Sequence, residues 1–243
     1  MSPSFTLPDA ASLRDLRTYL GRAARVEDGS VRLIAGSGVL AVYTAILYPV
    51  GLLDEVPTVL GLRTFELASP ATFDAVVPIA SFLERLNRLA DRIATEDDDA
   101  PDDAPTTAST GDGSGSVGIT AELPLEVHTV TWAAISPPRG GWSPLPDLDL
   151  TALRDQAAAG IAEVAETVPT AAGDAVVRRV RAEVWGRPIE RAEHVPAGAA
   201  FAAESLGFLA DGDRVRLFEA GPWGRLTTSR GHVLVKRRPV AAR

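Results

Sequence analysis

The feature that most limits how this chain can fold is an uncharged stretch from Leu33 to Leu53. A run of about 20 uncharged residues is long enough to cross a bilayer as a helix. Glycines and Pro49 interrupt this run, however, and valine, isoleucine and tyrosine are frequent in it, which favours strands over a helix. We therefore expect a buried hairpin with strands at 31–35 and 39–48 and a turn at Gly36–Gly38. A membrane segment over 33–53 is the alternative.

The rest of the first half contains two clear helical patterns. Leu13, Leu16 and Leu20 recur at helical spacing and predict a helix over residues 10–25. A second helix is expected at 79–94 by the same argument, with Ser69-Pro70 as the start of a shorter one. Two further strands are predicted from β-branched and alternating residues, at 58–68 and 126–135.

Two segments are predicted to divide the chain. The acidic run Glu96–Asp103 and the Thr/Ser/Gly residues that follow it have too few apolar groups to repay ordering, so 95–118 is expected to be a mobile loop. The proline- and glycine-rich stretch 136–146 is the predicted boundary between a first part, 1–135, and a second part, 147–243.

The second part combines helices with a short meander. Apolar spacing predicts helices from 147 to 167, after Gly173-Asp174, and at 198–206. Three alternating segments follow, at 214–219, 223–228 and 232–236. The fold class expected for the whole chain is therefore α+β: an antiparallel sheet packed with helices, followed by a helical segment that ends in a small antiparallel β-meander.

A weak internal similarity links the two parts. The sequence Asp28-Gly29-Ser30-Val31-Arg32-Leu33 resembles the sequence from Asp211 to Leu217, and each follows a predicted helix. Either a helix–hairpin unit has been duplicated, or a common turn precedes a common strand.

Composition limits the chemistry and the location of the protein. The chain has no cysteine, which excludes disulfides and thiolate chemistry. Lys236 and Asn87 are the only lysine and asparagine, which indicates a GC-rich, bacterial genome and makes arginine abundance weak evidence for phosphate binding. The first residues lack the basic head and apolar core of a signal peptide, so a soluble, cytoplasmic protein is expected.

The best candidates for a binding surface are three tryptophans beside glycines. Trp185-Gly186-Arg187 and Trp223-Gly224-Arg225 share one pattern, and Trp142 follows a glycine pair. Aromatic rings with nearby arginines are typical of interface hot spots. We therefore predict a non-catalytic binding or assembly module whose partner is a protein, either a second copy or another chain, with Trp142, Trp185, Arg187, Trp223 and Arg225 as contacts. The opposing interpretation is that each indole closes the edge of a core.

Nucleic-acid binding is an alternative function. Residues 175–243 carry a net charge of +6 and residues 1–174 carry −14. The basic end, with Lys236, Arg237 and Arg238, would contact phosphates, although the short helix before it has no side chains suited to base edges.

An enzyme with an unrecognised site is the remaining alternative. The three histidines have no metal-ligand spacing, and no nucleophile elbow occurs. We accordingly expect no metal, no cofactor and no catalytic residue that the sequence identifies.

Overall fold

The computed structural model describes residues 3–51, 54, 56–98, 118–169, 171–190 and 192–237. These residues form five α-helices and a large antiparallel sheet with two small ones, so the predicted α+β class is confirmed. The helices are α1 (Ala10–Val26), α2 (Ile79–Asp98), α3 (Leu150–Thr167), α4 (Asp174–Gly186) and α5 (Ala197–Ser205).

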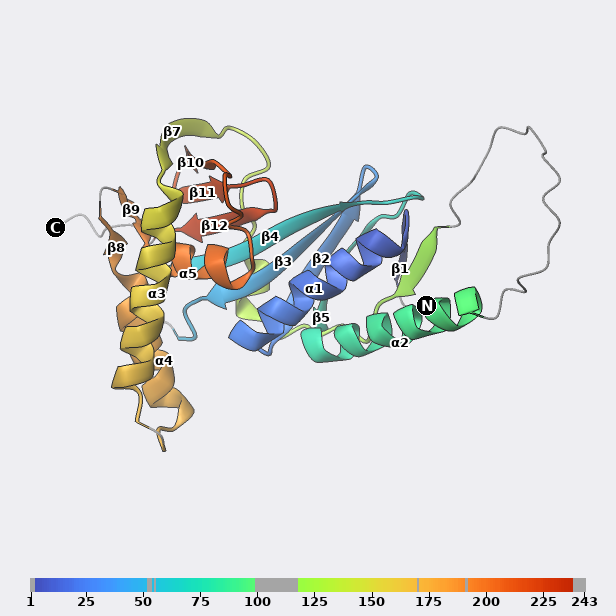
Figure 1. Cartoon of the computed structure of the whole chain (residues 1–243), viewed down its shortest axis with the longest axis horizontal. Coiled ribbons are helices and arrows are strands. Elements are labelled where there is room, and N and C mark those ends of the chain that lie inside the picture. Colours follow the sequence, from blue (N-terminus) through green and yellow to red (C-terminus); the bar gives the residue numbers. More distant parts are fainter. Residues whose placement is uncertain are drawn as a thin grey trace.

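One eight-stranded sheet joins both halves of the chain (Figure 1). Its order is β5-β2-β3-β4-β12-β11-β10-β7, and all neighbours are antiparallel. The first half supplies β2 (Ser30–Gly36), β3 (Val39–Leu47), β4 (Thr58–Glu66) and β5 (Phe73–Pro78); the second supplies β7 (Ser143–Leu148), β10 (Val215–Ala220), β11 (Trp223–Thr227) and β12 (His232–Lys236). The small sheets pair β1 (Ser4–Leu7) with β6 (Ile119–Glu122), and β8 (Pro188–Ile189) with β9 (Ala192–Pro196).

The uncharged run forms the hairpin β2–β3. Its two-residue turn, Ser37-Gly38, has positive φ at both positions (53° and 76°), which matches the twist that a tight hairpin requires. The inward residues of both strands, among them Leu33 and Val42, are fully buried. No described helix is long and apolar enough to cross a membrane.

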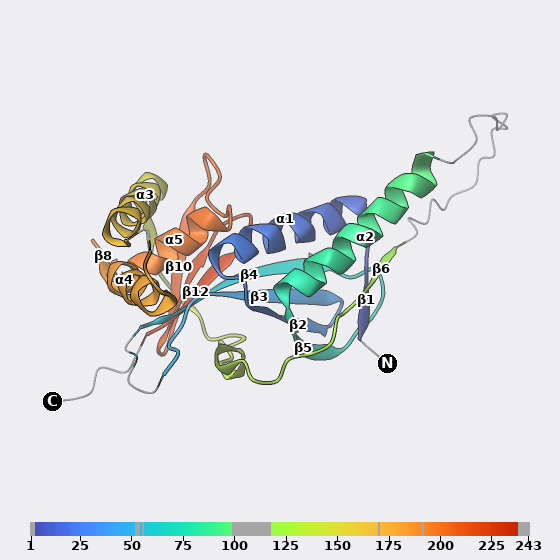
Figure 2. The ribbon, with the colours of Figure 1, turned by 90° about the horizontal axis from the view of Figure 1, so that it is seen from below.

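The α-helices cover one face of the large sheet, and the opposite face carries none of them (Figure 2). The main core lies between these layers. Its largest fully buried side chains are Tyr19, Phe5, Phe82, Phe208, Leu7, Leu16, Leu20, Leu33, Leu40, Ile79 and Leu86. Tyr19 shows how the helix side meets the sheet: its hydroxyl pairs with Thr44 Oγ1 at 2.9 Å, which satisfies two polar groups inside the core.

The two halves repeat one arrangement around the β4–β12 pair. Each half contributes a helix followed by three antiparallel strands, α1-β2-β3-β4 and α5-β10-β11-β12. From the β5 edge of the sheet to its centre the order is β2, β3, β4, and from the β7 edge to the centre it is β10, β11, β12. The similar sequences that start at Asp28 and Asp211 lie at the same point of this repeat, where each runs from the preceding turn into β2 or β10. The structure thus favours a duplicated unit over a shared turn sequence.

Two local predictions are wrong. Ser69-Pro70 does not begin a helix, because β5 follows it and the helix begins only after Pro78. Residues 126–135 are not a strand: they run irregularly and end in a short 3-10 helix, η1 (Thr131–Ala134). The stretch 136–146, which is the predicted boundary between the two parts, partly forms β7 at the edge of the sheet. Both chain parts contribute to one sheet, and their separation as domains stays a prediction.

The predicted mobile loop overlaps α2, which extends to Asp98. The remainder of that prediction, residues 99–117, lies outside the described residues.

Candidate interaction surface

Residues 123–142 cross the face of the sheet that carries no α-helix, called here the helix-free face; this crossing segment is irregular except for the short 3-10 helix η1. Val127 donates its backbone N–H to the Val76 carbonyl on β5 at 2.8 Å. Arg32 on β2 then holds the middle of the segment, since its guanidinium donates to the Ala133 carbonyl at 2.6 Å and pairs with Asp74 at 2.6 Å. The segment reaches β11 at Trp142. It therefore covers part of the helix-free face, including residues of β11 and β12.

Beneath this crossing segment lies a second, smaller core. Trp132 and Ala133 of the segment pack against Ala45, Leu60, Trp223 and Leu234 of the sheet, and all six are buried. Trp142 lies at the margin of this cluster and is partly exposed. Trp223 is 5% exposed, so its indole packs inside this second core and does not present a face to a partner.

Above this cluster, Arg225 lies between two aromatic rings. Its guanidinium carbon is 4.5 Å from the Trp142 ring centre and 4.8 Å from that of Phe218. Phe218 faces Arg225 across the β10–β11 pair, which places both on the helix-free face. We call Trp142, Arg216, Phe218, Arg225 and His232 the Arg225 surface. Stacking against two rings holds the guanidinium in one orientation.

The electrostatics of this surface are unusual for a set of arginines. Arg225 Nε is buried and has no hydrogen-bond partner among the described residues. Burial, and then the charge of Arg216, lower the pKa of the Arg225 guanidinium. No described carboxylate forms a salt bridge with either arginine. The surface therefore carries two neighbouring positive charges that the described chain leaves uncompensated.

His232 extends the same surface onto β12. Its Nδ1 lies 3.1 Å from Thr227 Oγ1, and the ring is half-buried. Burial first, and then Arg225 and Arg216, lower the pKa of the His232 imidazole. The ring is consequently neutral near pH 7 while the surface is free.

Trp185 corrects the sequence-based expectation of exposed tryptophans. It is 2% exposed on the helix side of the sheet and stacks on Phe201, with ring centres 4.3 Å apart. Its ring also lies directly against Gly160 of α3. The expectation of an exposed indole is thus wrong for Trp185 and for Trp223, because both fill cores. Arg187, at the end of α4, is exposed and forms salt bridges with Glu163 and Glu183, so the structure does not bring it to the Arg225 surface.

The predicted basic end is partly compensated. Arg237 donates to the Gly221 carbonyl at 2.9 Å and lies 3.7 Å from Glu219. Lys236 is partly buried on β12, paired with Thr58 and Trp223 of the neighbouring strands. Arg238 lies outside the described residues. Phosphate binding by these three residues stays a prediction.

Sequence reasoning found Trp142 and Arg225 but missed Arg216, Phe218 and His232 as parts of one surface. The alternation of β10 gave a partial signal, because residues two apart share a face. Phe218 lies opposite Arg225 because of the register of β10 and β11. Trp142 lies near β11 because of the path of the crossing segment. No local sequence pattern predicts either the register or the path.

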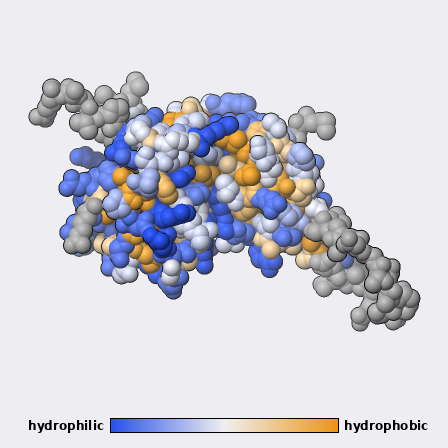
Figure 3. Space-filling view, turned by 90° about the horizontal axis from the view of Figure 1, so that it is seen from above, coloured by the Kyte–Doolittle hydropathy of each residue, from blue (hydrophilic) through white to orange (hydrophobic). Residues whose placement is uncertain are grey.

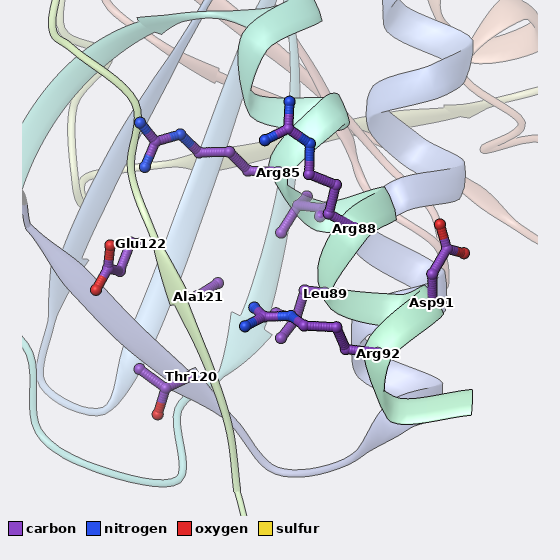
Figure 4. A pocket seen from close by; sticks show the side chains of 9 residues that line it. Arg85, Arg88, Leu89, Asp91, Arg92, Thr120, Ala121 and Glu122 are labelled. Carbon is purple, nitrogen blue, oxygen red and sulfur yellow. The ribbon is translucent and has the colours of Figure 1, made fainter. Parts of the chain in front are cut away.

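Two hollows lined by arginines lie on the helix layer. A hollow of about 1010 Å³ is lined by residues of α2 and β6, and Arg85 and Arg92 extend from α2 toward that strand (Figure 4). Its lining also includes Asp91 and Glu122, so its charge is mixed. A groove of about 500 Å³ runs between α1 and α2 and is lined by four arginines of α1. Within the described part of the chain, no group of three His, Asp or Glu side chains is arranged to hold a metal ion.

Two family models match the chain. A domain of unknown function, DUF8010, matches residues 1–109, and another, DUF8185, matches residues 137–240. Each covers less than half of the sequence, and neither description states an activity. No curated protein matches.

Similar solved structures include bacterial sliding clamps. The DNA polymerase sliding clamp from Caulobacter crescentus is 13% identical, with a TM-score of 0.47, over 100% of this chain and 66% of that chain. The corresponding values are 13%, 0.45, 99% and 66% for the clamp from Pseudomonas aeruginosa with ligand, and 12%, 0.45, 100% and 67% for the Bartonella birtlesii DnaN sliding clamp bound to griselimycin. This chain thus spans about two thirds of the length of those proteins. At these identities and TM-scores the likeness carries no inference about function.

Proposed function

We propose that this chain is a non-catalytic binding module whose Arg225 surface holds an acidic segment of a protein partner. The observation that carries the proposal is the position of Arg225, held between Trp142 and Phe218 with no described carboxylate beside it. A guanidinium fixed in this way is ready to bind, because little further side-chain ordering is needed when a partner arrives.

The composition of this surface supports a protein partner. Tryptophan and arginine are enriched in interface hot spots, particularly where aromatic rings exclude water from a charged group. The sheet next to the Arg225 surface adds a small apolar area, because half-buried Leu62 of β4 and Tyr43 of β3 lie on the same face of the sheet. Figure 3 shows apolar patches interleaved with hydrophilic side chains on the side of the molecule that it presents.

The charge of the surface indicates what the partner contributes. Arg216 and Arg225 repel each other, and an Asp or Glu placed between them would relieve that repulsion and hydrogen-bond to both guanidiniums. A second copy of the chain is one possible source of the carboxylate, since residues 1–174 carry a net charge of −14. A different acidic protein is the other source.

A matched pair of variants tests this proposal. R225Q removes the charge held against the two rings, whereas R187Q removes an exposed arginine that forms salt bridges with Glu163 of α3 and Glu183 of α4. Tagged wild type and both variants are used as baits in cells that produce the protein, and co-purifying proteins are quantified. Far-ultraviolet circular dichroism melts confirm that each bait is folded.

We expect proteins enriched by wild type and R187Q to be lost with R225Q, because truncating a central hot spot costs at least about 2 kcal/mol, or roughly thirtyfold in affinity. Recovery of the bait's own untagged chain would identify a second copy as the partner. Equal enrichment by wild type and R225Q, or equal loss with both variants, would refute the proposal.

A further inference from the structure

The groove between α1 and α2 concentrates positive charge on the opposite side of the sheet from the Arg225 surface. Its lining comprises Arg14, Arg17, Thr18, Gly21, Arg22 and Arg25 of α1 with Leu83 and Asn87 of α2. No carboxylate is among these residues. The four arginines follow helical spacing along one side of α1, so they form a row and not a scattered set.

Of the twenty arginines in the described part of the chain, twelve form no salt bridge with a described carboxylate, and the four arginines of this row are among those twelve. Eight arginines in the described part of the chain have a carboxylate within salt-bridge distance; they are Arg32, Arg63, Arg88, Arg154, Arg181, Arg187, Arg214 and Arg237. None of the four arginines in the groove has such a described partner. Codon usage explains why arginine is frequent, but it does not explain why four arginines without carboxylate partners line a single groove.

Two of the four arginines are held in position by neutral groups. Arg17 Nε donates to Asn87 Oδ1 at 2.8 Å, which ties α1 to α2 across the groove. Arg22 donates to the Leu206 carbonyl at 3.2 Å and lies over Gly207, whose φ is +72°. A Cβ atom on Gly207 would come within 1.8 Å of the Arg22 guanidinium, so this glycine leaves room for the arginine. Both contacts orient a guanidinium without neutralising it.

The length of the row indicates the kind of anion. Arg14 and Arg25 are eleven positions apart in the sequence, which corresponds to about 16 Å along a helix at roughly 1.5 Å per residue. A single phosphate cannot contact both ends, whereas duplex DNA carries about one charge per 1.7 Å of its axis. We propose that the groove between α1 and α2 binds the phosphodiester backbone of a nucleic acid, without reading its sequence. The Arg225 surface takes no part in this binding.

The test compares two double variants in a binding titration. R14Q/R25Q removes the two exposed ends of the row, and R178Q/R179Q removes two exposed arginines of α4 that have no described carboxylate partner. Both change the net charge equally, and none of the four residues is buried. The probe is a fluorescently labelled DNA duplex of mixed sequence, with anisotropy recorded at several salt concentrations.

For wild type we expect affinity that falls steeply with salt and does not depend on the duplex sequence. R14Q/R25Q should bind at least about tenfold more weakly at low salt, with the salt slope reduced by roughly 2, or about one per lost phosphate contact. R178Q/R179Q should leave that slope unchanged. Absence of wild-type binding at low salt, or equal losses in both double variants, would overturn the proposal. Partner enrichment through Arg225 should be unaffected by R14Q/R25Q, so the two proposals can fail independently.

Discussion

Replacing Gly160 with alanine tests whether Trp185 belongs to the core. Gly160 lies within α3, and a Cβ atom there would come within 2.3 Å of Trp185 Cζ3 and 2.5 Å of Cη2. The indole cannot simply move aside, because its other face stacks on Phe201 at 4.3 Å between ring centres. The added methyl group therefore forces two packed rings to shift.

Two opposing effects set the size of the change. Inserting a methyl group into a packed core costs about 1–3 kcal/mol, and the short distances here favour the upper end. Alanine also stabilises a helix interior by about 1 kcal/mol relative to glycine. We therefore expect G160A to lower the free energy of unfolding by about 2 kcal/mol. With W185F, which removes the ring atoms that clash, the same substitution should instead stabilise by about 1 kcal/mol.

Urea unfolding followed by circular dichroism measures all four members of this cycle: wild type, G160A, W185F and G160A/W185F. The expected coupling is about 3 kcal/mol, well above the error of such measurements. If G160A stabilises the wild-type background, or if the two substitutions are additive, Trp185 does not pack against α3. The assignment of this indole to the core would then be wrong.

Two further predictions concern a buried hydroxyl and a titrating ring. Y19F should lower the free energy of unfolding by about 1–2 kcal/mol in urea titrations, because Thr44 Oγ1 loses its partner inside the core, whereas an unchanged value would show that the pair is not formed. For His232, whose pKa is held below its usual value, the unfolded chain binds more protons as the pH falls below about 6.5. Wild type should therefore lose stability through that range more steeply than H232Q, and parallel pH profiles would contradict this.

The sequence predicted those helices and strands in which the spacing of apolar residues follows from burial of one face of the element. Helix α1 and the β2–β3 hairpin were expected within about two residues, because leucine spacing and a glycine turn depend on local packing alone. Residues 126–135 alternate as a strand does, yet the segment crosses a sheet face and makes a backbone hydrogen bond to β5 only at Val127. The alternation of apolar and polar residues indicates which side chains face the sheet. It does not show whether a neighbouring strand is free to form backbone hydrogen bonds with the segment.

The candidate surface was predicted only in part, for a similar reason. Trp185-Gly186-Arg187 and Trp223-Gly224-Arg225 are the same pattern, but the first tryptophan ends a helix on the covered face and the second lies on the opposite face. Arg187 meets carboxylates of α3 and α4, while Arg225 meets aromatic rings brought from β10 and residue 142. The surroundings of each arginine are set by which strands and helices pack together in the folded protein, and a three-residue pattern cannot specify that packing.

The claim that the Arg225 surface contacts a protein is tested most directly by photo-crosslinking inside cells that produce this chain. A benzoylphenylalanine residue replaces exposed Ser143, which adjoins Trp142 and is not one of the five residues of the Arg225 surface, and a control carries it at exposed Arg179 on α4. We predict a discrete covalent protein adduct from position 143 that is absent from position 179 and lost when R225Q is added. No adduct from position 143, or the same adducts from both positions, would contradict the proposal.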